Sequence, residues 1–189
     1  MPNLCMNKII ITIDGLSASG KSTVARRLAK ILGFVHLNSG ALYRSVGVRA
    51  VTHGIPLDAE DKIVELASLM QFSFKLDEEN NTKLFVDGLP TGTEITTEQS
   101  GHYASTVGLL PKLREIITEV QRSIAKDTSV VLEGRDAGTV VFPNAPFKFF
   151  VDATVEERSR RRLLELKNHP AFQGQTLDIE QVRREIEER

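Results

Sequence analysis

The chain has 189 residues, of which 41% are hydrophobic and 26% charged, a balance typical of a soluble protein with one globular core. Its net charge of −1 provides no basic field for nucleic acid or an anionic membrane, and no apolar stretch approaches the length of a membrane span. The single cysteine, Cys5, cannot form an internal disulfide, and the segment from Met1 to Asn7 lacks the apolar region of a secretory signal. We therefore expect a cytoplasmic protein without nucleic-acid or membrane partners.

The first predicted elements are a strand, a glycine-rich loop and a helix. The apolar run Lys8–Ile13 predicts a buried parallel strand, and Gly33 is a natural stop for a helix over residues 20–33. A second short strand follows at residues 35–37. A βαβ unit of this kind predicts a parallel, doubly wound sheet, in which ligands bind beyond the carboxyl ends of the strands. The apolar residues of the helix predict one buried face, made by Val24, Ala25, Leu28, Ala29 and Leu32.

The loop between this strand and helix reads Gly-Leu-Ser-Ala-Ser-Gly-Lys-Ser at residues 15–22, which is the spacing of a phosphate-binding loop. The two glycines permit a tight turn, and successive backbone N–H groups at the helix start then face phosphate oxygens. Lys21 adds a mobile positive charge, and Ser22 offers its hydroxyl to Mg²⁺. The alternative of a structural glycine-rich turn does not account for Lys-Ser at this offset. We expect the loop to bind a nucleoside triphosphate.

The middle of the chain is predicted to be two helices followed by an antiparallel insert. Ser39 is expected to cap a helix that carries Arg44 near the ligand rim, and Asp58 to cap a second helix through Met70. Alternating apolar residues around a polar turn then predict a β-hairpin over residues 72–86. A third short strand is expected at residues 93–95, before a helix over residues 96–110.

The last part of the chain returns to alternating helices and strands. Pro111 begins a clear amphipathic helix, and strands are predicted at residues 129–132 and 147–151. The first of these strands runs into a charged, glycine-bearing loop at residues 133–139, on the same rim as the phosphate loop. Two final helices are predicted, the first beginning at Thr154 and ending at Leu166, and the second running from a cap at Asp178 to Arg189.

Arginines follow several of the predicted strand ends. Arg44 and Arg135, together with the four arginines of residues 158–162, suit bidentate contact with phosphate oxygens. Such a set indicates a second anionic group near the γ-phosphate, and therefore phosphoryl transfer to a phosphorylated acceptor rather than hydrolysis. In this chemistry catalysis is mainly positioning and charge neutralisation, so we expect no catalytic base of unusual pKa.

Two plainer interpretations stand beside this one. Any single arginine of residues 158–162 could instead lie on a solvated helix face, paired with Glu156, Glu157 or Glu165 at helical spacing. The histidines are scattered without metal-ligand spacing and are interpreted as structural or surface residues; they are His36, His53, His102 and His169.

Three further segments are more specific than the phosphate loop. They are residues 39–44 (Ser-Gly-Ala-Leu-Tyr-Arg), residues 134–143 with Gly-Arg-Asp and Gly-Thr-Val-Val-Phe-Pro, and Ala104-Ser105 with Pro111-Lys112-Leu113-Arg114. With these segments the chain resembles the bacterial cytidylate kinases from about Ile9 to Arg189. The resemblance implies an α/β fold in which a P-loop parallel sheet is wrapped by helices, with an antiparallel β insert and a helical lid. It also implies a core at residues 7–38 and 110–153, an acceptor-binding domain at 39–109 with its insert at about 71–95, and a lid at 154–189.

The resemblance implies a role for each matched site residue. Residues that neutralise charge during transfer are Lys21, Arg135, Arg161 and Arg162. Residues expected to bind ATP are Gly15, Leu16, Ser17, Ala18, Ser19, Gly20, Lys21, Ser22, Thr23, Arg158 and Arg161, with Ser22 also on the metal. Residues expected to bind CMP are Ser39, Tyr43, Arg44, Ser105, Arg114, Arg135, Asp136 and Arg189; among these, Ser105 and Arg114 are expected to read the cytosine edge.

The activity implied is transfer of the γ-phosphate of ATP to CMP, and to dCMP, with Mg²⁺, by a monomer in pyrimidine nucleotide metabolism. Two positions depart from the family pattern, since Asn38 and Glu133 stand where an aspartate or other acidic residue is common. Family chains also continue beyond the counterpart of Arg189 with further acceptor-site residues. One alternative is therefore a nucleotide-binding module without turnover. Another is a kinase with a different acceptor, such as UMP, AMP or shikimate, of which the long hairpin argues against shikimate.

Overall fold

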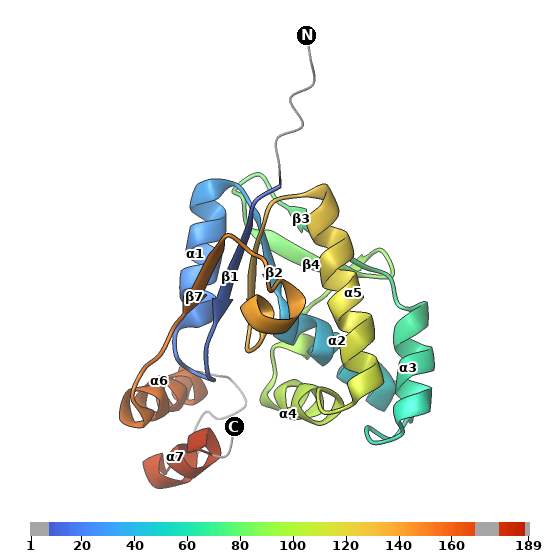
Figure 1. The fold of residues 1–189 in the computed structure, drawn as a ribbon. Helices are drawn as coiled ribbons and strands as arrows, with labels where there is room; N and C mark the ends of the chain where they lie inside the picture. Colours follow the sequence, from blue (N-terminus) through green and yellow to red (C-terminus); the bar gives the residue numbers. More distant parts are fainter. Residues whose placement is uncertain (1–7, 169–177, 188–189) are drawn as a thin grey trace.

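The computed structural model describes residues 8–168 and 178–187 (Figure 1). Cys5, His169 and Arg189 lie outside these residues. Within them, no helix is long and apolar enough to cross a membrane. The chain forms a parallel sheet with helices on both faces, a small antiparallel sheet, and two helices, α6 (Val155–Asn168) and α7 (Ile179–Glu187), beside the end of the parallel sheet (Figure 1).

The central sheet has the strand order β2-β6-β1-β7, and its three pairings are all parallel. This arrangement confirms the doubly wound sheet predicted from the first βαβ unit. It also puts the ends of β1, β2 and β6 at one edge, where the segments after these strands meet. The strands are β1 (Ile10–Asp14), β2 (Val35–Asn38), β6 (Val130–Gly134) and β7 (Phe147–Phe150).

Helices cover both faces of this sheet because its strands are apolar on both sides. On one face, α1 (Lys21–Leu32) packs through Ala25 and Ala29 against Ile11, Ile13 and Val131. On the other face, α2 (Ser39–Thr52) and α5 (Pro111–Asp127) enclose the larger core. Fully buried members of that core include Leu37, Leu42, Val46, Leu113, Ile117 and Leu132.

The buried face of α1 differs from the one predicted. Val24 and Leu32 are 47% and 42% exposed, whereas Ala25 and Ala29 are almost completely buried. Val24 and Ala25 point about 100° apart around the helix axis, so the buried stripe is centred on Ala25, Leu28 and Ala29. Alanine at the contact lets the helix axis come close to the sheet, and the larger apolar residues then lie at the margin.

The predicted hairpin is confirmed. Strands β3 (Phe72–Leu76) and β4 (Thr82–Val86) pair antiparallel, and Asp87 and Gly88, both at positive φ, turn the chain into β5 (Leu89–Pro90). The prediction of a strand at residues 93–95 was wrong. Residues Thr93–Ile95 form the single 3₁₀ turn η1, because the third strand is already completed by the two residues after the tight turn.

The remaining helices are α3 (Glu60–Leu69), α4 (Glu98–Val107), α6 (Val155–Asn168) and α7 (Ile179–Glu187). The caps expected at Thr154 and Asp178 are confirmed, since their side-chain oxygens accept hydrogen bonds from the N–H groups of Glu157 and Glu180. The cap expected at Asp58 was wrong. Ala59 occupies the N-cap of α3 without a side-chain hydrogen bond, and Asp58 accepts from Glu60 through its backbone carbonyl instead.

Candidate active site

The phosphate loop joins β1 to α1 at the carboxyl edge of the sheet (Figure 1). Ala18 and Gly20 lie in the left-handed region, with φ of 59° and 96°, so the loop turns back on itself before the helix begins. Gly15 is required by space, because a Cβ there would lie 2.3 Å from the carbonyl oxygen of Val151. The loop therefore has the tight backbone that its sequence predicts.

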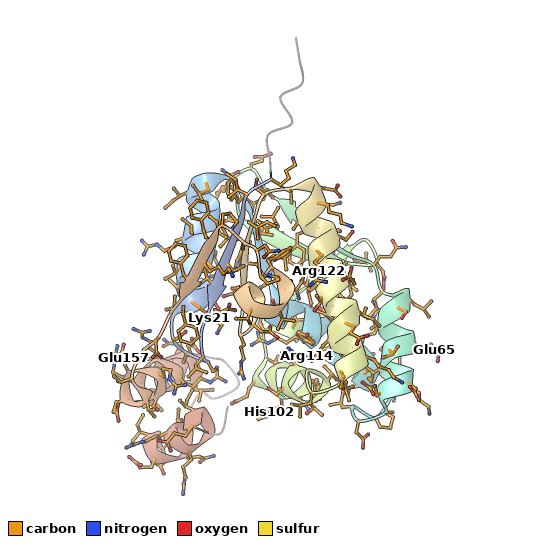
Figure 2. All side chains as sticks on the ribbon, in the orientation of Figure 1. Lys21, Glu65, His102, Arg114, Arg122 and Glu157 are labelled. Carbon is orange, nitrogen blue, oxygen red and sulfur yellow. The ribbon has the colours of Figure 1, made fainter. Side chains whose placement is uncertain are left out.

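Lys21 Nζ folds back over the loop and donates a hydrogen bond to the carbonyl oxygen of Leu16 over 3.1 Å. In the view of Figure 2, Lys21 lies between Glu157 of α6 and Arg114 of α5. Burial lowers the pKa of the Lys21 ammonium, and the charges of Arg135 and Arg44 lower it further, while Glu133 acts in the opposite direction. Cations from three separate segments are thus close enough to repel one another.

Glu133 supplies the negative charge opposite these cations. Its side chain at the end of β6 is only 2% exposed, and His36 Nε2 lies 3.3 Å from its Oε1. Burial opposes ionisation, but polar contacts with His36 and Ser22 and the charge of Lys21 hold the pKa of Glu133 below its ordinary value. The carboxylate is therefore charged at neutral pH, beside the first turn of α1.

A second buried carboxylate, Asp14, was missed by the sequence analysis. Its Oδ1 and Oδ2 each accept a backbone hydrogen bond of 2.8 Å, from the N–H groups of Ala137 and Gly138. These donors begin the π-helical turn η2 (Ala137–Val141), a rare conformation that is often found at functional sites. Asp14 thereby ties the start of the phosphate loop to the loop that carries Arg135 and Asp136. The sequence feature that could have indicated Asp14 is an acidic residue at the end of an apolar strand.

The start of α2 is built differently from the prediction. Asn38, rather than Ser39, is the N-cap, and its side-chain oxygen accepts a hydrogen bond of 3.0 Å from the N–H of Ala41. The prediction that Ser39 caps the helix was therefore wrong by one residue. Ser39 is buried, and its hydroxyl lies 3.4 Å from Oε1 of Gln121 on α5. A buried Ser39 in this place holds α2 to α5 at the sheet edge.

Residues of α2 and α5 form a second group beside the cations. Arg114 pairs with Asp136 and also donates to the carbonyl oxygen of Gly108 over 3.2 Å. Burial is the main cause that raises the pKa of the Tyr43 phenol to about 12. The charges of Arg114 and Asp136 also act on this phenol, in opposite directions. Arg44 donates to the carbonyl oxygen of Ile95 over 3.3 Å. Ser105 is exposed on α4, and its hydroxyl donates to the carbonyl oxygen of Gly101 in the same helix.

The arginines of α6 divide into distinct environments. Arg161 Nη1 donates to the carbonyl oxygen of Ser19 in the phosphate loop over 2.7 Å. Arg162 contacts Glu98 of α4 at 3.2 Å, across the edge of the sheet from the loop. Arg158 is 6% exposed, with its Nε buried and lacking a hydrogen-bond partner among the described residues. Arg160 matches the solvated-face interpretation, because its exposed side chain pairs with Glu157 of the same helix.

Glu157 holds two of these arginines. Its carboxylate accepts hydrogen bonds of 2.7–2.9 Å from Arg160 and Arg161. These hydrogen bonds lower the pKa of Glu157 to about 2, so the carboxylate stays charged over the whole working range of pH. Among residues 8–168 and 178–187, no three His, Cys, Asp or Glu side chains form a cluster that could hold a metal ion on their own.

The sequence was compared with protein families and with curated proteins. The family described as "Cytidylate kinase" matches residues 11–189. This chain belongs to the cytidylate kinase family. A relative named "Cytidylate kinase" from Caldanaerobacter subterraneus subsp. tengcongensis is 44% identical over 179 residues, which cover 95% of this chain and 76% of the relative.

Two more relatives of the same name give similar values. The protein from Pelotomaculum thermopropionicum is 42% identical over 179 residues, covering 95% of this chain and 77% of its own. The protein from Vibrio cholerae is 40% identical over 180 residues, covering 95% of this chain and 78% of its own. Membership of a family of nucleoside monophosphate kinases agrees with a phosphate loop that faces additional arginines.

Proposed function

We propose that this chain transfers the γ-phosphate of ATP to CMP, and also to dCMP, giving CDP or dCDP and ADP. The observation that carries the proposal is the convergence of Lys21, Arg44 and Arg135, whose charges meet beside the phosphate loop. A loop with one lysine suffices for a triphosphate alone. Two further cations, Arg44 in α2 and Arg135 just after β6, provide for a second phosphate, that of the acceptor.

On the donor side, residues 15–23 would hold the ATP phosphates through their backbone N–H groups, with Lys21 and Arg161 on the β- and γ-phosphates. The hydrogen bond of Arg161 to Ser19 supports this assignment, because it already brings a guanidinium onto the loop. Arg158, buried beside it, would complete the donor site. Arg162 would turn from Glu98 to the transferred group.

On the acceptor side, Arg44 and Arg135 would bind the CMP phosphate, and Ser39 would position the start of α2. The base would lie toward Ser105 and Arg114, where a hydroxyl and a guanidinium can donate to the O2 and N3 acceptors of cytosine. The pairing of Arg114 with Asp136 supports this role, because a fixed guanidinium can discriminate between base edges. Tyr43 lies beside this pair. Arg189 is proposed for the acceptor phosphate from the family pattern alone.

The residues beside the loop fit Mg²⁺, which prefers oxygen ligands and retains bound waters. Ser22 would be the ligand. Both carboxylate oxygens of Glu133 are buried without a well-aligned hydrogen bond to a described residue, so they have spare capacity to accept from metal-bound water. When bound with ATP, the ion would neutralise charge on the β- and γ-phosphates.

The residues of the chain would then position the two nucleotides and neutralise the charge of their phosphates. Lys21 and the arginines compensate the charge that spreads over the transferred group, and Asp14 keeps the two loops at a fixed separation through its two backbone hydrogen bonds. We assign the core to residues 7–38 and 110–153, the acceptor domain to 39–109 with its insert at 71–95, and the lid to 154–189. We further propose a cytoplasmic monomer.

An acceptor panel tests this function. The protein is incubated with Mg·ATP and, in separate reactions, CMP, dCMP, UMP, AMP or shikimate, and ADP formation is followed. ADP should form fastest with CMP, next with dCMP, and slowly or not at all with the others. Equal rates for all acceptors, or ADP formation that needs none, would exclude it. A binding module without turnover is not favoured, because the relatives are named as kinases; such a module would bind ATP and CMP without forming CDP.

A further inference from the structure

His36 lies on the sheet face that α1 covers, at the end that binds phosphate. In the parallel pairing of β2 with β6, His36 is opposite Val131 and Asn38 is opposite Glu133. Side chains two residues apart in a strand point to the same face, so His36 and Glu133 are diagonal neighbours. The two side chains are 9% and 2% exposed, and Nε2 lies 3.3 Å from Oε1. The imidazole therefore meets the carboxylate out of contact with water.

Their chemistry sets the favourable protonation of this contact. A carboxylate offers only acceptors, so the contact is favourable when the proton is on Nε2 of His36. The two groups meet at 3.3 Å without the alignment of a hydrogen bond, and Nε2 and both Glu133 oxygens form none with a described residue. Glu133 also lies near the first turn of α1, where Ser22 and the charge of Lys21 help to hold the pKa of Glu133 below its ordinary value. One buried carboxylate thus joins His36 to two residues of the phosphate loop.

We infer that His36 is a positioning residue for the triphosphate site: the buried contact of its Nε2 with Oε1 at 3.3 Å restrains the Glu133 carboxylate, and Glu133 in turn orients Ser22 and Lys21. A glutamate side chain has several rotatable bonds, and burial alone does not choose among its rotamers. A polar group on the neighbouring strand, Nε2 of His36 at 3.3 Å, favours one of these rotamers. This inference rests on the proposed function only for the identity of the ligand, ATP with Mg²⁺.

A purely structural role for His36 makes a different prediction. If the imidazole only satisfies a buried acceptor, its loss lowers the stability of the protein but leaves the folded protein with unchanged affinity for Mg·ATP. If it positions Glu133, its loss weakens Mg·ATP and leaves CMP, which binds on the other side of the cation group, unaffected. Ligand affinity and thermal stability, measured on the same variants, separate the two roles.

The variants are chosen so that size and polarity are matched. His36→Gln places an amide N–H close to the position of Nε2, whereas the shorter amide of His36→Asn does not reach Glu133. His36→Leu removes the donor altogether. Thr82→Val is the control, because Thr82 Oγ1 accepts the backbone N–H of His36 over 2.9 Å and its loss disturbs the same strand without touching the imidazole.

The experiment is calorimetric titration of the full chain with Mg·ATP and, separately, with CMP, beside thermal unfolding. His36→Leu and His36→Asn should weaken Mg·ATP by about tenfold, as losses of supporting residues around metal sites commonly do, with CMP changed by less than about twofold. His36→Gln and Thr82→Val should bind both ligands as the wild type does. In the Glu133→Gln background, His36→Leu should cause no further loss of Mg·ATP affinity.

Unchanged Mg·ATP affinity in folded His36→Asn and His36→Leu would overturn the inference, as would additive losses with Glu133→Gln. If His36→Leu does not fold, the His36→Gln and His36→Asn variants decide. Equal affinities of these two variants for Mg·ATP would contradict a positioning role for His36. The titrations need no turnover. Failure of the wild type to phosphorylate CMP would therefore remove the proposed function while leaving this measurement of Mg·ATP binding intact.

Discussion

Arg161 of α6 donates a hydrogen bond to the carbonyl oxygen of Ser19, so a helix more than a hundred residues away in sequence contacts the phosphate loop. The contact is close, since a Cβ on Gly20 would lie 3.0 Å from the same guanidinium nitrogen. Glu157 holds the other side of the guanidinium over 2.7 Å. The arginine is thereby fixed within reach of the phosphates that the loop would bind.

Arg161→Ala is expected to lower kcat by about a hundredfold, a typical cost of removing one donor to developing charge. The matched control is Arg160→Ala. Arg160 is the preceding residue on the same helix and pairs with the same glutamate, but its side chain is exposed. Steady-state rates with varied ATP at saturating CMP check this prediction. Losses of similar size in both variants would show that the α6 arginines act through net charge rather than through the contact with Ser19.

Ser105→Ala is expected to raise KM for CMP by about tenfold with little change in KM for ATP, because leaving a polar group of the base unpaired costs about 1–3 kcal/mol. Thr106→Ala is its control. Both hydroxyls are exposed and donate to the carbonyl oxygen one turn earlier in α4, at 3.0 Å and 3.2 Å. Only Ser105 belongs to the proposed base site. A KM for CMP that rises equally in both variants, or not at all, would remove Ser105 from that site.

Tyr43 offers a prediction for alkaline pH. Burial raises the pKa of its phenol to about 12, above the value of about 10 expected in the unfolded chain. The folded state therefore holds this proton more tightly, and the stabilisation is complete below pH 10 and lost as pH rises toward 12. The chain has two tyrosines and no tryptophan, so tyrosinate absorbance can be followed directly.

The measurement is a spectrophotometric titration of the wild type and of Tyr43→Phe. A component near pH 12 should be present in the wild type and absent from the variant, provided that the protein remains folded, which circular dichroism checks. The assignment is contradicted if the substitution removes absorbance change centred near pH 10 instead.

Much of the donor site could be predicted from local sequence. The phosphate loop depends on a short, contiguous pattern, and both of its positive φ values fall within that pattern, at Ala18 and Gly20. The meeting of Arg44 and Arg135 with Lys21 followed from topology, because parallel strands end at one edge of the sheet. The phosphate loop and the neighbouring cations can therefore be predicted without knowing how the side chains pack.

The buried polar contacts could not be predicted in this way. Asp14 meets backbone donors more than a hundred residues away in sequence, and His36 meets Glu133 through a strand register that the sequence does not specify. The N-cap at Asn38 was missed because Asn38 and Ser39 are both good capping residues, and only the strand end decides between them. Sequence patterns thus predicted which edge of the sheet gathers the phosphate loop and its cations, whereas the contacts that support them depend on tertiary packing.

The central claim is that the cations around Lys21 serve transfer between two nucleotides. The most direct test follows labelled γ-phosphate of ATP in the presence of Mg²⁺ and CMP, with the wild type, Lys21→Ala and the surface control Lys30→Ala. The label should appear in CDP with the wild type and Lys30→Ala, and at least about a hundredfold more slowly with a folded Lys21→Ala. Label released as inorganic phosphate at a rate independent of CMP, or CDP formed equally by Lys21→Ala, would contradict the account.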